Sequence, residues 1–188
     1  MENHRKNLVL CGFMGCGKTT VGKRLSKMIG YEFLDMDQYI ERQQGMTISQ
    51  IFEQKGEPEF RRIECETVRE LAKREGLVIA TGGGALINPD NAREFQKTGE
   101  IILLDTPLRA LQERLKNCDD RPVLKQGDPD RAAFIAQLHA KRMPFYQNAA
   151  NWVIDAGAPV KEVTRRIMQA LSLTPKPEPQ NSYSPHQG

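Results

Sequence analysis

The stretch GFMGCGKT, Gly12 to Thr19, follows directly on the apolar run Leu8 to Cys11 and matches the pattern G-x-x-x-x-G-K-[ST] in full. Glycines at this spacing let the backbone turn so that its N–H groups point inward at a phosphate, and a helix that begins behind them adds partial positive charge. We expect Lys18 to reach the β- and γ-phosphate oxygens and Thr19 to place its hydroxyl on Mg²⁺. The stretch therefore predicts a strand, a loop and a helix that hold the phosphates of a nucleoside triphosphate.

The alternative for this stretch is a glycine-rich turn with a surface lysine, which the strand before it and the helix after it make less favourable. Phosphate binding alone leaves three classes open: a small-molecule kinase, a GTPase switch and a motor ATPase. A GTPase needs a segment that recognises the base, such as NKxD, which the sequence lacks. A motor ATPase usually has additional domains to move, and 188 residues leave no room for them. A small-molecule kinase remains, and it needs an acceptor pocket and a mobile cover.

Short apolar runs alternate with helical patterns along the rest of the chain, which is typical of βαβ units around a parallel sheet. The runs VIA and IILL are apolar without alternation, as expected of strands that are covered on both faces. The expected strands lie near Leu8 to Phe13, Glu32 to Asp37, Leu77 to Thr81, Glu100 to Asp105 and Asn151 to Asp155. These features predict an α/β fold with three layers, α/β/α, around a central five-stranded parallel sheet.

Helix boundaries are marked in the sequence. Gly30 is a plausible end for the helix that begins at Lys18, Thr47 with Gln50 forms a capping-box pattern, and Asn88 before Pro89 is typical of a helix start.

We expect one domain over residues 1–173. The Pro-rich segment 174–188 has almost no apolar residues, so we expect a disordered tail there.

The amino-acid composition limits the classes of partner that we expect for this protein. The net charge is only +3, with 27 basic and 24 acidic residues mixed along the chain, which argues against a nucleic-acid partner. The sequence has no apolar run near the ~20 residues that span a bilayer and no room for a signal peptide before the first strand. Its four cysteines form no CxxC pair, so we expect free thiols. We expect a cytoplasmic monomer without a membrane partner.

Two carboxylates stand at the end of the second expected strand, in Asp35-Met36-Asp37. Residues two apart on a strand face the same way, so both would point from the carboxyl end of the sheet toward the nucleotide. One could hold the metal through water while the other receives the acceptor hydroxyl. A solvated strand end followed by a helix cap is the alternative.

Two further stretches suggest an acceptor site. In GEPEFRRIE, Arg61 and Glu64 are three residues apart on a helix, so the carboxylate could orient the guanidinium to grip an acceptor carboxylate; an exposed ion pair is the alternative. The three glycines Gly82 to Gly84 after LVIA suggest a ligand pressed against bare backbone N–H groups, with a flexible turn as the alternative.

Together these residues resemble the shikimate kinases, a family of P-loop kinases that transfer the γ-phosphate of ATP to the 3-hydroxyl of shikimate. The family's motifs occur here in order, from about residue 7 to residue 171, as GFMGCGKT, DMD, GEPEFRRIE, GGG, RPVL and RMPFY. The resemblance implies ATP and shikimate as substrates and Mg²⁺ as the cofactor. It implies an acceptor-binding segment at about 36–64 and a lid at about 117–130.

The resemblance also implies individual roles. On the acceptor side, Asp37 would bind the reacting hydroxyl and act as a catalytic residue, and the acceptor would be held by Arg61, Gly82, Gly83, Gly84 and Arg142. Asp35 would join Thr19 at the metal, and Glu64 would orient Arg61. Lys18, Asp37 and Arg121 would be the catalytic set, with Arg121 folding over the transferred phosphoryl group from the lid.

On the donor side, the resemblance implies that ATP is held by the following residues: Gly12, Gly15, Cys16, Gly17, Lys18, Thr19, Thr20, Arg114, Arg121 and Pro159. The segment Asp155 to Pro159 lacks an arginine that is often present near the adenine, and RPVL replaces RPLL. A gluconate kinase, a nucleoside monophosphate kinase and a nucleotide-binding module without turnover are the alternatives that remain.

Overall fold

The computed structural model describes residues 5–116 and 130–176. Its strands are β1 (Asn7–Cys11), β2 (Glu32–Asp35), β3 (Leu77–Ala80), β4 (Gly99–Asp105) and β5 (Trp152–Asp155). Its helices are α1 (Lys18–Ile29), α2 (Met36–Gln44), α3 (Ile48–Ala72), the short 3₁₀ helix η1 (Ala85–Ile87), α4 (Pro89–Thr98), α5 (Leu108–Leu115), α6 (Arg131–Ala149) and α7 (Val160–Ala170). The alternation of strands and helices is the one predicted from the sequence.

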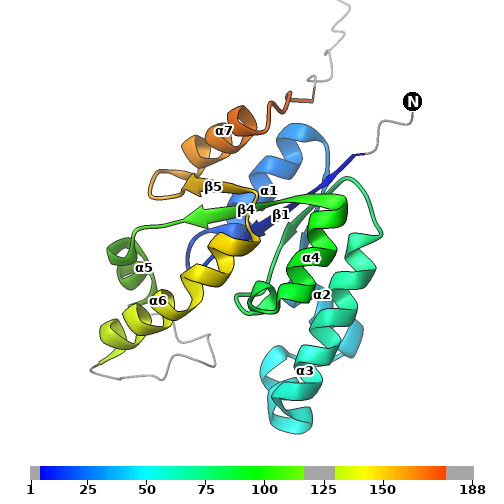
Figure 1. Cartoon of the computed structure of the whole chain (residues 1–188), viewed down its shortest axis with the longest axis vertical. Helices are drawn as coiled ribbons and strands as arrows, with labels where there is room; N and C mark the ends of the chain where they lie inside the picture. Colours follow the sequence, from blue (N-terminus) through cyan, green and yellow to red (C-terminus); the bar gives the residue numbers. More distant parts are fainter. Residues whose placement is uncertain (1–4, 117–129, 177–188) are drawn as a thin grey trace, which may run out of the picture.

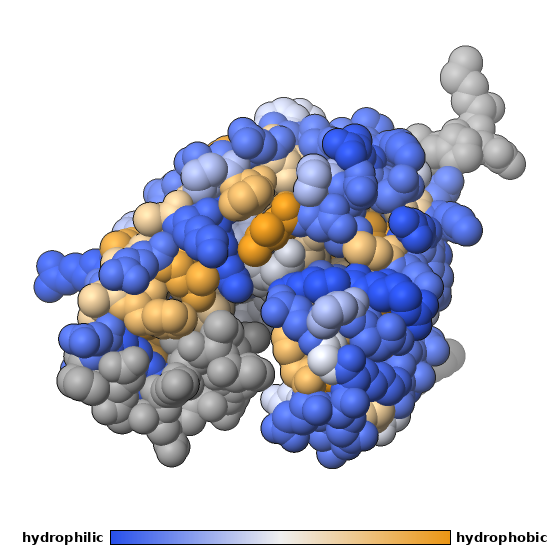
Figure 2. Space-filling model, turned by 60° about the horizontal axis from the view of Figure 1, so that its bottom comes forward, coloured by the Kyte–Doolittle hydropathy of each residue, from blue (hydrophilic) through white to orange (hydrophobic). Residues whose placement is uncertain are grey.

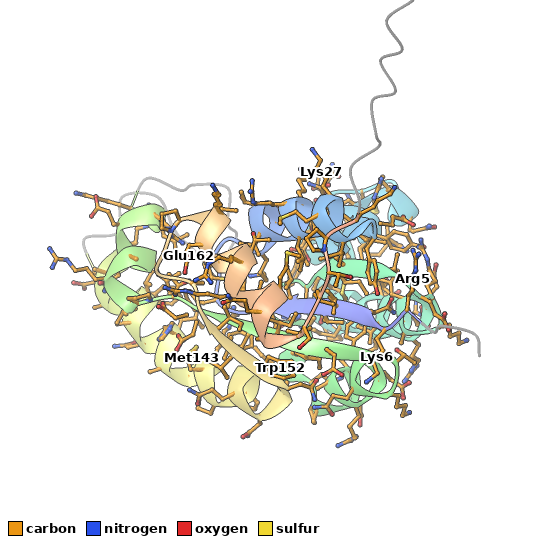
Figure 3. All side chains as sticks on the ribbon, turned by 90° about the horizontal axis from the view of Figure 1, so that it is seen from above. Arg5, Lys6, Lys27, Met143, Trp152 and Glu162 are labelled. Carbon is orange, nitrogen blue, oxygen red and sulfur yellow. The ribbon has the colours of Figure 1, made fainter. Side chains whose placement is uncertain are left out.

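The strands form one parallel sheet in the order β2-β3-β1-β4-β5. Helix α1 covers one face of the sheet, while α4 and α6 cover the other (Figures 1 and 3). Helix α7 packs against α1 and β5. The predicted three-layer fold with five parallel strands is confirmed. Because every strand runs the same way, the segments that follow the strands meet at one edge.

The central strands are buried on both faces, as their uninterrupted apolar runs predicted. All five residues of β1 and all four of β3 are buried. Edge strand β5 buries only Ile154 and exposes Trp152 and Val153. Among residues 5–116 and 130–176, none of the helices combines the length and the apolar character that crossing a membrane requires.

The predicted helix boundaries are also found. Gly30 ends α1, Asn88 caps α4 by accepting a bond from the Asp90 N–H, and Pro89 is the first helical residue. The capping box is complete, because Thr47 accepts from the Gln50 N–H and the Gln50 side chain accepts from the Thr47 N–H. Toward the C-terminus, the Lys176 N–H donates to the Met28 carbonyl at 2.6 Å, so the last described residue contacts α1.

The predicted end of the second strand was wrong. β2 stops at Asp35, whose carboxylate caps α2 by accepting from the Gln38 N–H at 3.4 Å, and Asp37 lies in the first turn of that helix. The two aspartates therefore do not alternate along a strand. Asp35 caps the helix instead of continuing the strand, because its carboxylate accepts from an N–H group that a helix start leaves without an intrahelical partner.

Helix α3 is broken at Gly56, which has φ +80° and ψ 164°. Pro58 follows the break and has no N–H to donate, which suits the first turn of the second segment. The part before Gly56 and the part after it can therefore take different directions. Both parts reach the cavity described below.

A buried asparagine connects three elements at the opposite end of the sheet. Asn7 is 0% exposed; its amide donates to the Arg74 carbonyl at 2.6 Å and the Leu71 carbonyl at 3.4 Å, and its oxygen accepts from the Leu77 N–H at 3.0 Å. The side chain thus joins β1 to the end of α3 and the start of β3.

We expect Asn7→Ala to lower the free energy of unfolding by about 1–3 kcal/mol, because it leaves buried backbone groups without partners. Urea denaturation measures the change. The neighbouring Lys6→Ala is the control: it removes an exposed ion pair with Glu100, worth at most about 1 kcal/mol. Equal losses for the two variants would contradict the structural role of Asn7.

Candidate functional site

The loop between β1 and α1 has the geometry predicted for a phosphate cradle. Gly12, Gly15 and Gly17 have φ of +137°, +77° and +98°. A Cβ on Gly12 would lie 2.9 Å from the Leu104 carbonyl, so the loop has no room for a side chain there. Helix α1 begins at the end of this loop, and its N-terminus faces the place where phosphates would bind.

The catalytic lysine of the prediction lies across the same loop. Lys18 Nζ donates to the carbonyls of Gly12 at 2.8 Å and Phe13 at 3.0 Å, and lies 3.7 Å from Cys16 Sγ. Its ammonium group is thereby held at the mouth of the cradle. That position suits a cation that contacts the outer phosphates of a nucleotide.

The two predicted metal ligands meet beside the lysine. Thr19 Oγ1 donates to Asp35 Oδ2 at 2.8 Å, although the two residues come from α1 and from the end of β2. Within the described parts of the chain, no group of three or more His, Cys, Asp or Glu side chains could hold a metal by itself. The pair nevertheless fits Mg²⁺, which prefers oxygen ligands and is usually held by one or two protein groups together with substrate phosphates and water.

A cavity of about 350 Å³ opens beside the cradle. In Figure 2, which turns the lower side of Figure 1 forward, the surface is hollowed next to the lobe that α2 and α3 form. Polar and charged groups of the cavity wall come from six segments: Lys18, Thr19, Asp35, Asp37, Glu57, Arg61, Glu64, Thr81, Gly82, Gly83, Gly84 and Arg142. The cavity thus collects every acceptor-side residue that the sequence predicted.

Arg61 of the cavity wall is held by two carboxylates. Its Nη1 donates to Glu64 Oε2 at 2.9 Å, and its Nε and Nη2 donate to Glu57 Oε1 at 3.2 and 3.1 Å. Glu64 is 2% exposed, and burial raises the pKa of its carboxyl group against the opposing effect of Arg61. The predicted Arg61–Glu64 pair is therefore present, and it is largely buried on the Glu64 side rather than a solvated surface pair.

The three glycines let these side chains approach the backbone. A Cβ on Gly82 would lie 2.5 Å from Asp37 Oδ1, and a Cβ on Gly84 would lie 2.5 Å from Arg61 Nη1. None of the three has positive φ, so space and not backbone conformation requires glycine here. Asp37 is thereby brought into the same cavity as Asp35, although it reaches the cavity from a helix and not from the strand that the sequence suggested.

Helix α6 closes the far side of the cavity. Arg142 lines it, and one turn later the buried Tyr146 hydroxyl donates to the Gly83 carbonyl. Burial raises the pKa of Tyr146 to about 12. Tyr146 lies within RMPFY, but no role was predicted for it; its spacing of four residues from Arg142 was the available signal.

The apolar part of the cavity and the carboxylate of Glu57 were not predicted from the sequence. Met14, Ile48, Phe52 and Phe60 provide apolar wall, and the Phe52 and Phe60 rings lie 4.7 Å apart between centroids. Ile48 and Phe52 precede the break at Gly56 and Phe60 follows it, so two segments of α3 line one cavity. Apolar residues on a helix give no sign in sequence of whether they face the core or a ligand.

A second cavity of about 340 Å³ lies behind the cradle. It is lined by Gly15, Cys16, Gly17, Thr20, Val21, Arg114, Ala156, Ala158, Val160 and Val163. Arg114 Nη1 donates to the Gly15 carbonyl at 3.0 Å, which places the guanidinium at the cavity's edge. Pro159 precedes α7 and is not among the lining residues, although its neighbours on both sides are.

Arg121 and the predicted lid up to residue 129 lie outside the described residues.

Comparisons with known proteins agree with this geometry. A family model described as shikimate kinase matches residues 14–172. A shikimate kinase of a Sulfurihydrogenibium species is 47% identical over 144 residues, which cover 77% of this chain and 84% of the relative. The shikimate kinase of Thermodesulfovibrio yellowstonii is 40% identical over 164 residues, with 87% and 94% covered.

A solved structure gives the same result in three dimensions. The structure of shikimate kinase from Acinetobacter baumannii in complex with shikimate superimposes with a TM-score of 0.83 at 36% identity, covering 89% of this chain and 93% of that one. With the phosphate cradle, the arginine-lined cavity and a family match over most of the chain, the conclusion is direct: this chain belongs to the shikimate kinase family.

Proposed function

We propose that this protein transfers the γ-phosphate of ATP to the 3-hydroxyl of shikimate, giving shikimate 3-phosphate and ADP on the route to chorismate and the aromatic amino acids. One observation carries the proposal: a single cavity brings Arg61, held by the buried Glu64, to the same space as the cradle residues Lys18 and Thr19. An anionic acceptor gripped at one end would present a hydroxyl at the other. The family membership favours shikimate over the alternatives that the motifs alone left open.

The acceptor would be held by its carboxylate and by its ring. Arg61 and Arg142 supply positive charge to one cavity from α3 and α6, and paired N–H donors suit a carboxylate. Phe52 and Phe60 offer apolar surface for the carbon ring. Gly82 to Gly84 would let the ligand lie close to the backbone, and Asp37, which lines the same cavity, would accept a hydrogen bond from the reacting hydroxyl.

The donor would be held mainly by backbone and by Lys18. The cradle binds the phosphates, and the cavity lined by Arg114 and Ala158 accommodates the base. Thr19 and Asp35 would hold Mg²⁺ together with the phosphates, and the ion would offset the negative charge of the transferred group.

Catalysis in this arrangement rests on alignment and charge. Phosphoryl transfer has a loose transition state, so positioning and positive charge contribute more than covalent participation of the protein. Asp37 would receive the proton of the attacking hydroxyl, Lys18 would stabilise the phosphate oxygens, and we assign the same stabilising role to Arg121. The cytoplasmic location and the monomeric state stay predictions.

The proposal is tested by a coupled assay with ATP, Mg²⁺ and shikimate, run beside gluconate and nucleoside monophosphates. We expect ADP release with shikimate alone and little ADP release without an acceptor, because water is a poorly positioned substitute. Phosphorylation of another acceptor while shikimate is untouched would reject the assignment.

Two arginine variants separate binding from turnover. We expect Arg61→Ala to raise the KM for shikimate by about 30-fold or more, since the change removes the carboxylate contact and leaves Glu64 buried without its partner. We expect Arg121→Ala to lower kcat by about a thousandfold or more, as for other arginines at a transferred phosphoryl group.

Steady-state kinetics with shikimate varied at saturating ATP provides both constants. Arg62→Ala is the matched control, because Arg62 stands next to Arg61 but pairs with Glu59 and Glu66 at the surface. It should leave both constants near those of the unmodified protein. If the Arg61 and Arg121 variants changed only the acceptor KM, the two roles would be wrong.

Tyr146 is expected to act as a positioning residue for the glycine segment. Tyr146→Phe removes the donor to the Gly83 carbonyl, worth about 1 kcal/mol, so we expect the acceptor KM to rise about three- to tenfold with a smaller change in kcat. Tyr39→Phe, which loses a hydroxyl bonded to Glu70 outside the cavity, is the control and should not change the KM. A loss of stability in Tyr146→Phe with unchanged kinetics would show a structural role only.

A further inference from the structure

The donors of Arg61 decide how an acceptor carboxylate could bind it. A guanidinium offers paired N–H donors along two edges, one formed by Nη1 with Nη2 and the other by Nε with Nη2. A carboxylate that binds bidentately needs one of these edges.

The Nη1/Nη2 edge faces protein. The position of a Cβ on Gly84 would lie 2.5 Å from Nη1, 3.0 Å from Nη2 and 3.1 Å from Cζ, so both terminal nitrogens lie nearer to it than the central carbon does. The end of the guanidinium thus points at the Gly84 backbone. Nη1 also donates to Glu64, which is 2% exposed. This edge is closed to a bidentate ligand.

The Nε/Nη2 edge is filled by a carboxylate of the protein itself. Glu57 Oε1 accepts from Nε at 3.2 Å and from Nη2 at 3.1 Å. Glu57 also lines the acceptor cavity, one residue after the break at Gly56. Its carboxylate stands where an acceptor carboxylate would have to stand.

The two glutamates on Arg61 differ in how firmly they are held. The Glu64 side chain is 2% exposed, whereas that of Glu57 is 62% exposed. Release of Glu64 would strand a buried charge, while release of Glu57 returns its carboxylate to water. Only Glu57 can leave Arg61 at small cost.

We propose that Glu57 is an internal competitor for the acceptor's carboxylate: it occupies the open edge of Arg61 and is displaced when the acceptor binds. The proposal rests on the proposed function, because it takes the acceptor to be an anion with a carboxylate. It makes Glu57 a specificity-determining residue. An alcohol without a carboxylate cannot replace Glu57 and meets an arginine whose charge is already paired.

The direction of the effect distinguishes competition from support. If Glu57 competes, Glu57→Gln weakens the internal contact and lowers the Kd and the KM for shikimate, about two- to fivefold for an exposed pair. If Glu57 merely orients Arg61, as Glu64 does, the same change raises both constants. Glu57→Ala should act in the same direction as Glu57→Gln.

The experiment is calorimetric titration with shikimate, together with steady-state kinetics, on the full-length chain. Glu59→Gln is the matched control, since it removes one negative charge two residues away from a surface pair with Arg62 and should leave both constants unchanged. Glu64→Gln should raise them. A shikimate analogue with the carboxylate reduced to a primary alcohol should gain nothing from Glu57→Gln.

Each outcome is decisive. Unchanged or raised constants in Glu57→Gln, or an equal gain with the alcohol analogue, would overturn the competition while the unmodified protein still phosphorylates shikimate. An unmodified protein that leaves shikimate untouched would overturn the proposed function, and this proposal with it.

Discussion

The site depends on one constraint, which is that β1, β2 and β3 are neighbours and run parallel. In the order β2-β3-β1 the carboxyl ends of the three strands lie next to each other, so the segments that follow them must share one edge. The phosphate cradle follows β1, Asp35 ends β2 with Asp37 two residues later, and the three glycines follow β3. No single segment forms the site, and the sheet brings the cradle, the aspartates and the glycines together.

The charged groups of the acceptor site lower the stability of the folded protein, because one of them is buried. Glu64 is buried, and a buried carboxylate is unfavourable without a partner, so Arg61 is held where the pair needs it. The approach of both charged groups to the chain requires the missing side chains at Gly82 and Gly84. The glycines and the ion pair therefore constrain each other, although they lie on different elements.

Local patterns predicted the features that depend on neighbouring residues. The cradle follows from eight consecutive residues, and the cap at Thr47 and the Arg61–Glu64 pair follow from residues three positions apart; the structure contains all three. The end of β2 was wrong because Asp35 can either continue a strand or cap a helix, and only the chain that follows decides between them. The role of Tyr146 was missed because its partner, the distant Gly83 carbonyl, becomes a neighbour only in the fold. Glu57 was also missed, although its spacing of four residues from Arg61 is a local signal that the sequence contains.

The two halves of the site are held in different ways, and this difference explains why they leave different signs in the sequence. The donor half is backbone: Gly12 has positive φ and no room for a Cβ, so its motif is short and strict. The acceptor half is built from side chains of α2, α3 and α6 against the glycine segment, with a break at Gly56 between two parts of its wall. The acceptor half can exchange the Glu57 carboxylate for that of a ligand by moving this one exposed side chain, while the buried Glu64 and the cradle stay in place. Rigid support on the donor side and an exchangeable contact on the acceptor side suit an enzyme that must hold ATP in one orientation and still admit and release a small anion.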